Sequence, residues 1–249
     1  MIGRPAVVLG MLVSASGWAI AQTPAAGAQT APPPMTNLQI IPKDTPRPQV
    51  LQQMQNIAAA LGVQCSYCHV MDSRGRNDMA ADDKPAKKAA RGMMLLTRDI
   101  NARLPDAIAK SPEATTRVGC ATCHRGVPIP KQITDVVTDA AASGGAAAGL
   151  SKYRELREKF YGGQSYDFSE NGLIATAQRA IAANRPDDAL AYLQANVEYY
   201  PKSARSYLVM SQAHLSKQDK AAAMKDLERA IDIDPNNAQA RAQLETLRK

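Results

Sequence analysis

The sequence predicts an all-α protein, with a small N-terminal helical domain followed by a row of C-terminal helices. Apolar residues recur at helical spacing over residues 48–61 and 85–104, and the last third of the chain contains an internal repeat. Aromatic residues are scarce, with one Trp and two Phe among 249 residues. The expected core is therefore thin for this length unless another large apolar group fills part of it.

The first 21 residues have the pattern of a secretory signal peptide. Arg4 supplies the positive start, residues 6–20 are mostly apolar, and residues 19–21 form a small-residue cleavage site. The apolar stretch is shorter than a membrane-spanning helix needs. We therefore expect cleavage and export to a bacterial periplasm, with no membrane span in the mature protein; an uncleaved anchor is the alternative.

The charge pattern gives no indication of a nucleic acid partner. The 30 basic and 23 acidic residues leave a net charge of +7, and the basic residues are spread along the chain. Proteins that bind nucleic acids gather such residues into a patch or stripe. A solvated, mildly basic surface is the expected result.

All four cysteines fall in two C-x-x-C pairs, and a histidine follows each pair directly. The first motif contains Cys65, Cys68 and His69, and the second contains Cys120, Cys123 and His124. Two thiols at this spacing can each bond to a vinyl group on one edge of a porphyrin, and the adjacent histidine then binds the iron as its proximal ligand. Because C-x-x-C-H is the attachment signature of c-type haem, the sequence predicts two covalently bound haem c groups.

Other uses of paired cysteines fit the sequence less well. Zinc sites built from two C-x-x-C pairs separate them by about 15–20 residues, whereas 51 residues lie between Cys68 and Cys120. Two disulfides are compatible with an exported protein but leave the two histidines without a role. A thioredoxin-like redox motif requires a βαβ pattern, and the flanking sequence lacks one.

The second axial ligands are expected to be methionines. The chain has three histidines, and only His214 remains, far from both motifs, where a satisfied core histidine is its expected role. Methionine is another common axial partner of haem iron. Met54 lies in the middle of the apolar stripe of the helix expected over residues 48–61, and Met93 lies on the apolar face of the helix expected over residues 85–104.

Two alternatives for the methionines stay open. A methionine on an apolar helical stripe more often fills a core than binds a metal. Met71 and Met79, in the loop after the first motif, are rival ligands. Met94 shares the more polar face of its helix with arginines, so Met93 is the better candidate of the two.

The residues around both motifs resemble the cytochrome subunit of photosynthetic reaction centres and related bacterial cytochromes. In that family each unit is a helix bearing the axial methionine, then a loop, then C-x-x-C-H. Here residues 54–57 (MQNI) precede the first motif, and residues 93–101 (MMLLTRDIN) precede residues 119–126 (GCATCHRG). The resemblance covers about residues 43–131 and implies that both candidate methionines are ligands. The family's subunit has four such units, whereas this chain has two and adds a C-terminal domain.

Two segments have the composition of linkers. Residues 22–42 are rich in Pro, Ala and Thr, which favours an extended tether. Residues 132–150 include an Ala- and Gly-rich run at positions 140–149, with no large side chain to join a core. They delimit a dihaem cytochrome c domain over residues 43–131 and a C-terminal domain over residues 151–249.

The C-terminal domain is expected to start with a short amphipathic helix over residues 151–160 and to continue as a repeat. Equivalent residues lie 34 positions apart, as in the pairs Pro201 and Pro235, Ala189 and Ala223, and Leu193 and Leu227. This pattern resembles tetratricopeptide repeats, which form an α-solenoid of paired antiparallel helices. The repeats span residues 170–203 and 204–237, with a capping helix over residues 238–249, and such repeats usually bind a protein partner.

Together these features predict a periplasmic electron carrier that exchanges single electrons with redox partner proteins and binds a further protein through its repeats. A haem enzyme, such as a peroxidase or a small-molecule reductase, stays open as an alternative. It needs an open axial position and a distal acid–base group, usually histidine, and no spare histidine lies near either motif. A repeat scaffold whose haems are structural is the third possibility.

Overall fold

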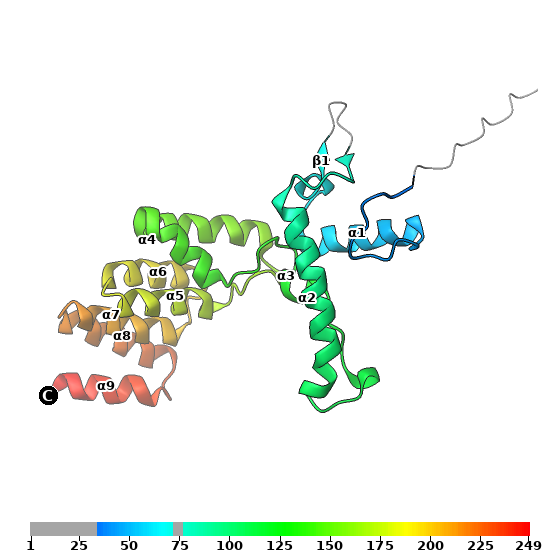
Figure 1. Ribbon diagram of the computed structural model, residues 1–249. Coiled ribbons are helices and arrows are strands. Elements are labelled where there is room, and N and C mark those ends of the chain that lie inside the picture. Colours follow the sequence, from blue (N-terminus) through cyan, green and yellow to red (C-terminus); the bar gives the residue numbers. More distant parts are fainter. Residues whose placement is uncertain (1–33, 72–76) are drawn as a thin grey trace, which may run out of the picture. The chain divides into compact units, whose positions relative to one another are not determined.

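The computed structural model describes residues 34–71 and 77–249, and the chain divides into two units after Thr36. The predicted signal peptide and residues 22–33 of the predicted tether lie outside the described residues. The second unit, residues 37–249, is mostly helical (Figure 1), which confirms the all-α prediction. Among the described residues, no helix has both the length and the hydrophobicity that a membrane crossing requires.

The N-terminal part of this unit is built from three helices, two single 3₁₀ turns and one small hairpin. In chain order these are α1 (Arg47–Leu61), η1 (Cys65–Tyr67), β1 (Val70–Met71), β2 (Asn77–Asp78), α2 (Pro85–Ala107), η2 (Pro112–Ala114) and α3 (Cys120–His124). Helix α1 ends where the sequence predicts, because Gly62 adopts the left-handed conformation (φ 65°) that glycine tolerates at a helix C-terminus. The two strands pair antiparallel, with Val70 opposite Asp78.

Helix α2 is longer than the sequence predicts. The pattern predicts an end at Leu104, before Pro105, but the helix continues to Ala107 with Pro105 inside it. Proline removes one N–H but its fixed φ is compatible with a helix. The last turn therefore persists, and the N–H groups of Ile108 and Lys110 donate to the carbonyls of Leu104 and Pro105.

The start of the haem region also differs from the predicted boundary. Composition assigns residues 37–42 to an extended tether, yet the Asn37 and Gln39 side chains donate hydrogen bonds to the Asp82 carboxylate at 3.0 and 3.2 Å. Ile41 is buried. These residues pack because a carboxylate on the loop before α2 supplies acceptors that composition does not reveal.

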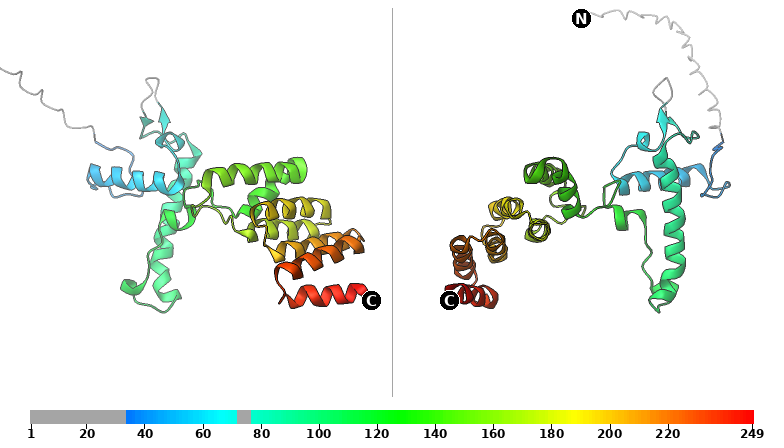
Figure 2. Two further views of the ribbon diagram at one scale, coloured as in Figure 1. Left: turned by 180° about the vertical axis from the view of Figure 1, so that it is seen from behind. Right: turned by 60° about the vertical axis from the view of Figure 1, so that its left-hand side comes forward.

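Six helices form the C-terminal part, and successive helices lie side by side in chain order (Figures 1 and 2). They are α4 (Ile133–Phe160), α5 (Glu170–Ala182), α6 (Pro186–Tyr199), α7 (Ala204–Ser216), α8 (Lys220–Ile233) and α9 (Ala238–Arg248). The starts of α5, α7 and α9 are evenly spaced along the chain, at the period of the sequence repeat. Side chains that accept hydrogen bonds from backbone N–H groups cap four of these helices at the N-terminus, namely Ser169, Ser203, Asp219 and Asn237.

The predicted linker over residues 132–150 is wrong, because these residues are largely helical. They form the first half of α4, which departs from helical geometry only at Gly144 and Gly145. The small residues serve close packing rather than flexibility. A β-carbon at Gly149 would lie 2.7 Å from the hydroxyl oxygen of Tyr192 on α6 and 3.0 Å from the Val137 carbonyl oxygen, so glycine allows this close packing.

The buried apolar residues gather in the C-terminal part. The larger cluster extends from Ile133 on α4 to Ala213 on α7, and the smaller one joins Leu208, Leu227 and Leu244. Ala189 and Ala223 are fully buried, as their small-residue positions require for close helix approach. Among the described residues before Ile133, none belongs to either cluster. The two cysteine motifs therefore lie outside both clusters, in a part of the described chain where few apolar side chains are buried, namely Ile41, Val50, Ala60, Leu61 and Val127.

Candidate haem-binding sites

The first motif forms a single turn shortly after α1. The N–H groups of Cys68 and His69 donate to the carbonyl of Cys65 at 3.2 and 2.9 Å. This turn brings the two thiols and the imidazole to one side of the backbone, since residues three and four apart share a helical face. Cys65 is exposed, and Cys68 and His69 are partly buried.

Two lysines at the start of α2 contact the segments around the first motif. Lys84 donates from Nζ to the carbonyl of Ser66, within the motif. Lys87 donates from Nζ to the carbonyls of Met79, Ala80 and Ala81 at 2.9, 3.2 and 2.7 Å, and the whole residue is only 8% exposed. The loop between the hairpin and α2, residues 79–84, therefore wraps around the buried ammonium group of Lys87.

The titratable groups of the first motif are tuned by burial and by these charges. Burial raises the pKa of the Cys68 thiol. Burial also lowers the pKa of His69, and the charge of Lys87 lowers it further. His69 is therefore neutral near pH 7, the form that coordinates a metal. Its Nδ1 atom is buried and has no hydrogen-bond partner among the described residues.

The second motif is the short helix α3, and its histidine is oriented by the backbone. The His124 Nδ1 atom lies 3.0 Å from the carbonyl oxygen of Val127. Because a carbonyl oxygen only accepts, Nδ1 carries the proton and Nε2 is left with its lone pair free to bind iron. Gly119 begins this helix, and its N–H donates to the Thr122 hydroxyl at 3.0 Å.

Backbone contacts hold the second motif against α1. The N–H of Gly126 donates to the carbonyl of Ala60 at 2.8 Å. Gly62 lies so close to Gly126 that a β-carbon on Gly62 would be 2.1 Å from the Gly126 carbonyl oxygen. After the motif, the Ser165 hydroxyl donates to the carbonyl of Arg125 at 2.6 Å.

A side-chain amide ties the second motif to α2. The Asn101 side chain donates from Nδ2 to the Val118 carbonyl at 2.8 Å and accepts from the Val118 N–H at 2.7 Å. This paired contact lies shortly before Cys120 in the chain. It determines where the second motif lies along α2.

The structure places the two candidate methionines on different helices, in different surroundings. Met54 is partly buried in the middle of α1, and Met93 is 44% exposed on α2. Met94 is partly buried, so the expected difference in exposure between the two neighbours is wrong. The reason is that the apolar face of α2 is only partly covered by the described residues. Met71 and Met79 are both exposed.

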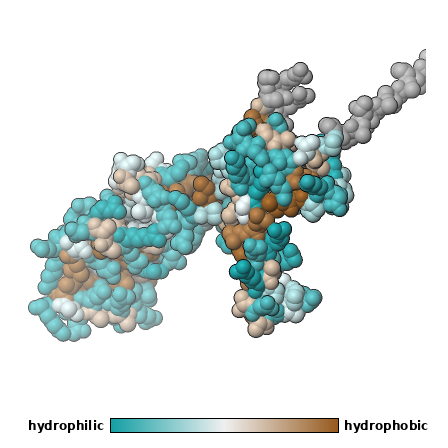
Figure 3. Space-filling model, in the orientation of Figure 1, coloured by the Kyte–Doolittle hydropathy of each residue, from teal (hydrophilic) through white to brown (hydrophobic). Residues whose placement is uncertain are grey.

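The described residues leave an apolar face of α2 partly exposed. Leu96 and Ile100 share it with Met93 and are 49% and 38% exposed. Figure 3 shows hydrophobic surface over the middle of α2 and on α1. All four cysteines are free thiols. Two large apolar groups, one bonded at each motif, fit this region. They would cover the exposed apolar side chains and add to the few that are buried.

Sequence reasoning missed three residues that shape these sites. Asp82 and Asn101 each join segments that are distant in the chain, and Lys87 binds the loop that precedes its own helix. Lysine in the first turn of a helix is usually solvated, so no local pattern marks Lys87 as buried. For Asn101, the only signal is its place on the same helix as Met93.

Comparison with known proteins places these motifs in a family context. A sequence model described as photosynthetic reaction centre cytochrome C subunit matches residues 21–232. Cytochrome c-554 of Chloroflexus aurantiacus is 43% identical over 75 residues, which are 30% of this chain and 16% of that protein.

Two further relatives are photosynthetic reaction center cytochrome c subunits. That of Rubrivivax gelatinosus is 36% identical over 69 residues, which are 28% of this chain and 16% of the relative. That of Thermochromatium tepidum is 40% identical over 67 residues, which are 27% of this chain and 14% of the relative. The chain thus aligns with about a sixth of the length of these relatives.

Proposed function

Because this chain belongs to the photosynthetic reaction centre cytochrome c subunit family, we propose that it is a periplasmic dihaem c-type cytochrome that transfers single electrons between redox partner proteins. The observation that carries the proposal is the pair of C-x-x-C-H turns, with free thiols, together with the exposed apolar side chains of Met93, Leu96 and Ile100 on α2. A bound haem c supplies reversible one-electron oxidation and reduction of its iron.

The chain's own residues have distinct roles in this proposal. Cys65 and Cys68 form the thioether bonds at the first motif, and Cys120 and Cys123 form them at the second. His69 and His124 would hold the two irons, and Met54 and Met93 are proposed as their second protein ligands. Methionine ligation leaves no position open for a substrate and favours electron transfer over bond-making chemistry.

The enzyme alternative lacks a distal acid–base histidine. The third histidine of the chain, His214, lies on α7 and shares a 2.7 Å hydrogen bond with Asp226 on α8. In this position His214 contributes to the contact between α7 and α8. Rapid binding of carbon monoxide to the reduced protein would favour the enzyme alternative over the electron carrier, because it requires an open axial position.

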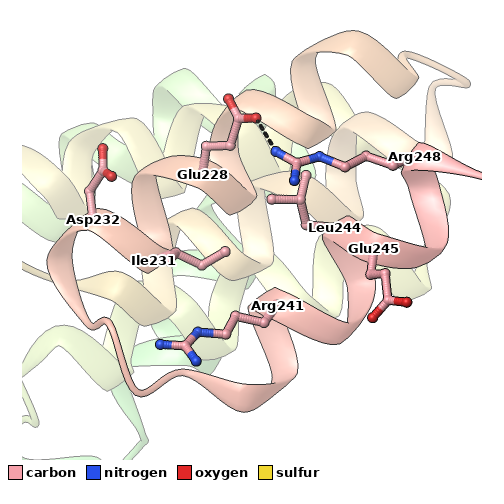
Figure 4. Close-up of a pocket in the computed structure, with 7 residues that line it drawn as sticks. All are labelled: Glu228, Ile231, Asp232, Arg241, Leu244, Glu245 and Arg248. Carbon is pink, nitrogen blue, oxygen red and sulfur yellow. Dashed lines mark hydrogen bonds and ion pairs between the residues drawn. The ribbon is translucent and has the colours of Figure 1, made fainter.

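The C-terminal helices support a tetratricopeptide-like solenoid that binds a protein partner. The even spacing of the helix starts and the buried alanines at equivalent positions support it. A groove between α8 and α9 has an apolar floor of Ile231 and Leu244, and a 3.1 Å ion pair joins Glu228 to Arg248 at its rim (Figure 4). The rim carries both signs of charge, which suits a polar peptide segment with an apolar anchor.

The test is to express the full chain with a cytochrome-maturation system and to measure its intact mass. Two covalent haems are expected. The C65A/C68A and C120A/C123A variants should each lose the mass of one haem, and each serves as the control for the other. Reversible potentiometric titration of both haems would support electron transfer over a structural role. A colourless mature protein would overturn the proposal.

A further inference from the structure

Among the lysines and arginines of the described residues, only Lys87 is buried. Its ammonium group donates to three consecutive carbonyls, those of residues 79–81, and lies 3.1 Å from the Asp82 carboxylate. An ammonium group placed this way cannot move into solvent without breaking all these contacts. Its position next to the first motif is therefore set by the backbone.

The Asp82 carboxylate does not neutralise this cation alone. It also pairs with Arg91 at 2.9 Å and accepts hydrogen bonds from Asn37 and Gln39. One carboxylate thus serves two cations, and Lys84 adds a third positive charge beside the motif. Asp78 pairs with Val70, the residue after His69, and Lys87 donates to the carbonyl of the next residue, Met79. The three cations therefore outnumber the carboxylates of Asp78 and Asp82 beside the first motif.

The second motif has a different environment. Its neighbouring arginines, Arg117 and Arg125, are exposed, so water and salt screen their charges. The His124 Nδ1–H group donates to the Val127 carbonyl, which makes the other ring nitrogen a stronger electron donor. A stronger donor stabilises the oxidised iron. Both features favour a lower reduction potential at the second motif.

Resting on the proposed dihaem function, we propose that Lys87 is an electrostatic positioning residue that raises the reduction potential at the first motif above that at the second. Reduction of a haem lowers its net charge by one. A fixed, buried positive charge nearby stabilises the reduced state more than the oxidised one. Lys87 then adds to the difference in potential between the two sites, although it coordinates neither iron.

The test is a potentiometric titration of the full two-haem protein, followed by optical spectra. Two one-electron components are expected. K87Q removes the charge but keeps amide donors, and it should lower only the higher component. At the wild-type midpoint, the ratio of reduced to oxidised haem in that component should fall roughly threefold to tenfold. K87R keeps the charge and should have the wild-type potential at the higher component. K88Q removes the charge of an exposed neighbour and should change neither component.

The D82N variant tests whether K87Q acts through the lost charge or through loosening of the loop over residues 79–84. Removal of the carboxylate should raise the higher component, opposite in direction to K87Q, whereas a loosened loop would move both variants the same way. A single unresolved component, a shift of the lower component in K87Q, or a K87R variant that behaves like K87Q would overturn the inference. Intact mass of each variant distinguishes these outcomes from failure of the proposed function, which would appear as missing haem.

Discussion

Gly62 and Gly126 approach each other so closely that neither α1 nor the second motif could occupy its place if Gly62 carried a side chain. Gly62 has φ 65°, and its absent β-carbon would lie 2.1 Å from the carbonyl oxygen of Gly126. Beside this contact, the Gly126 N–H donates to the Ala60 carbonyl at 2.8 Å. The end of α1 is thereby joined to the turn after the second haem motif, which is distant from it in the sequence.

Gly62→Ala is expected to destabilise the protein by at least about 2 kcal/mol. The left-handed conformation costs a residue with a β-carbon about 1–2 kcal/mol, and the clash with Gly126 adds to this. Chemical denaturation of the holoprotein measures the free energy of unfolding. Gly92→Ala is the matched control: it lies inside α2 with nothing within 4 Å of its β-carbon position, so the change should stabilise the helix by about 0.5–1 kcal/mol. Equal effects of the two substitutions would contradict the close approach.

Asn101→Ala should weaken the attachment of the second motif to α2. Both hydrogen bonds to Val118 are lost, and the Val118 backbone groups are left without these partners. At about 1 kcal/mol for each bond, the free energy of unfolding should fall by roughly 2 kcal/mol. The optical signal of the haem at Cys120 and Cys123 should broaden or shift while that of the first motif stays unchanged.

Asn56→Ala is the control for this substitution. Asn56 is exposed on α1, and its side-chain oxygen accepts a hydrogen bond from Gln52 on the same helix. It should change the free energy of unfolding by less than about 0.5 kcal/mol. The account of Asn101 fails if the two variants are equally stable.

Met54→Leu and Met93→Leu test the proposed axial ligands. Each should remove one share of the far-red charge-transfer band of the ferric protein, because leucine fills a similar volume but cannot coordinate iron. Met94→Leu should leave the band intact. If instead a substitution at Met71 or Met79 removes a share, the rival ligand is correct.

The Asp82 network predicts a defined pH dependence. Hydrogen bonds from Arg91, Asn37 and Lys87 hold the pKa of Asp82 well below its usual range. A carboxyl group whose folded pKa is depressed stabilises the fold above its unfolded pKa of about 4 and loses that effect as the pH falls further. Wild type should therefore be more stable than D82N at pH 7, and the difference should shrink below about pH 4. Equal stability of the two proteins at pH 7, measured by denaturation, would count against the network.

Local chemistry explains what the sequence predicted well. The end of α1 at Gly62 follows from the conformational freedom of one residue, and the helix content follows from apolar spacing. The haem motifs are equally local, since five adjacent residues carry both thiols and the ligand. The ligand roles stay predictions that the methionine substitutions test, and the tetratricopeptide-like character of the repeats stays a prediction.

Non-local contacts explain what the sequence could not predict. The run around Gly149 has the composition of a linker, but Tyr192 on another helix makes its small residues a packing surface. Pro105 has the pattern of a helix end, yet α2 continues beyond it to Ala107. At Gly149 the local sequence lacks the neighbour that decides the outcome, whereas at Pro105 the last turn is held by local bonds from Ile108 and Lys110 to the carbonyls of Leu104 and Pro105.

By itself, the sequence determined that this chain is helical, that it carries two C-x-x-C-H motifs, and that its C-terminal part contains an internal repeat. These are properties of neighbouring residues and of periodicity. Only the tertiary structure decided that Lys87 is buried beside the first motif and that Asn101 holds the second. The burial of a side chain depends on backbone that arrives from elsewhere in the chain, and that arrangement is not encoded at any single position.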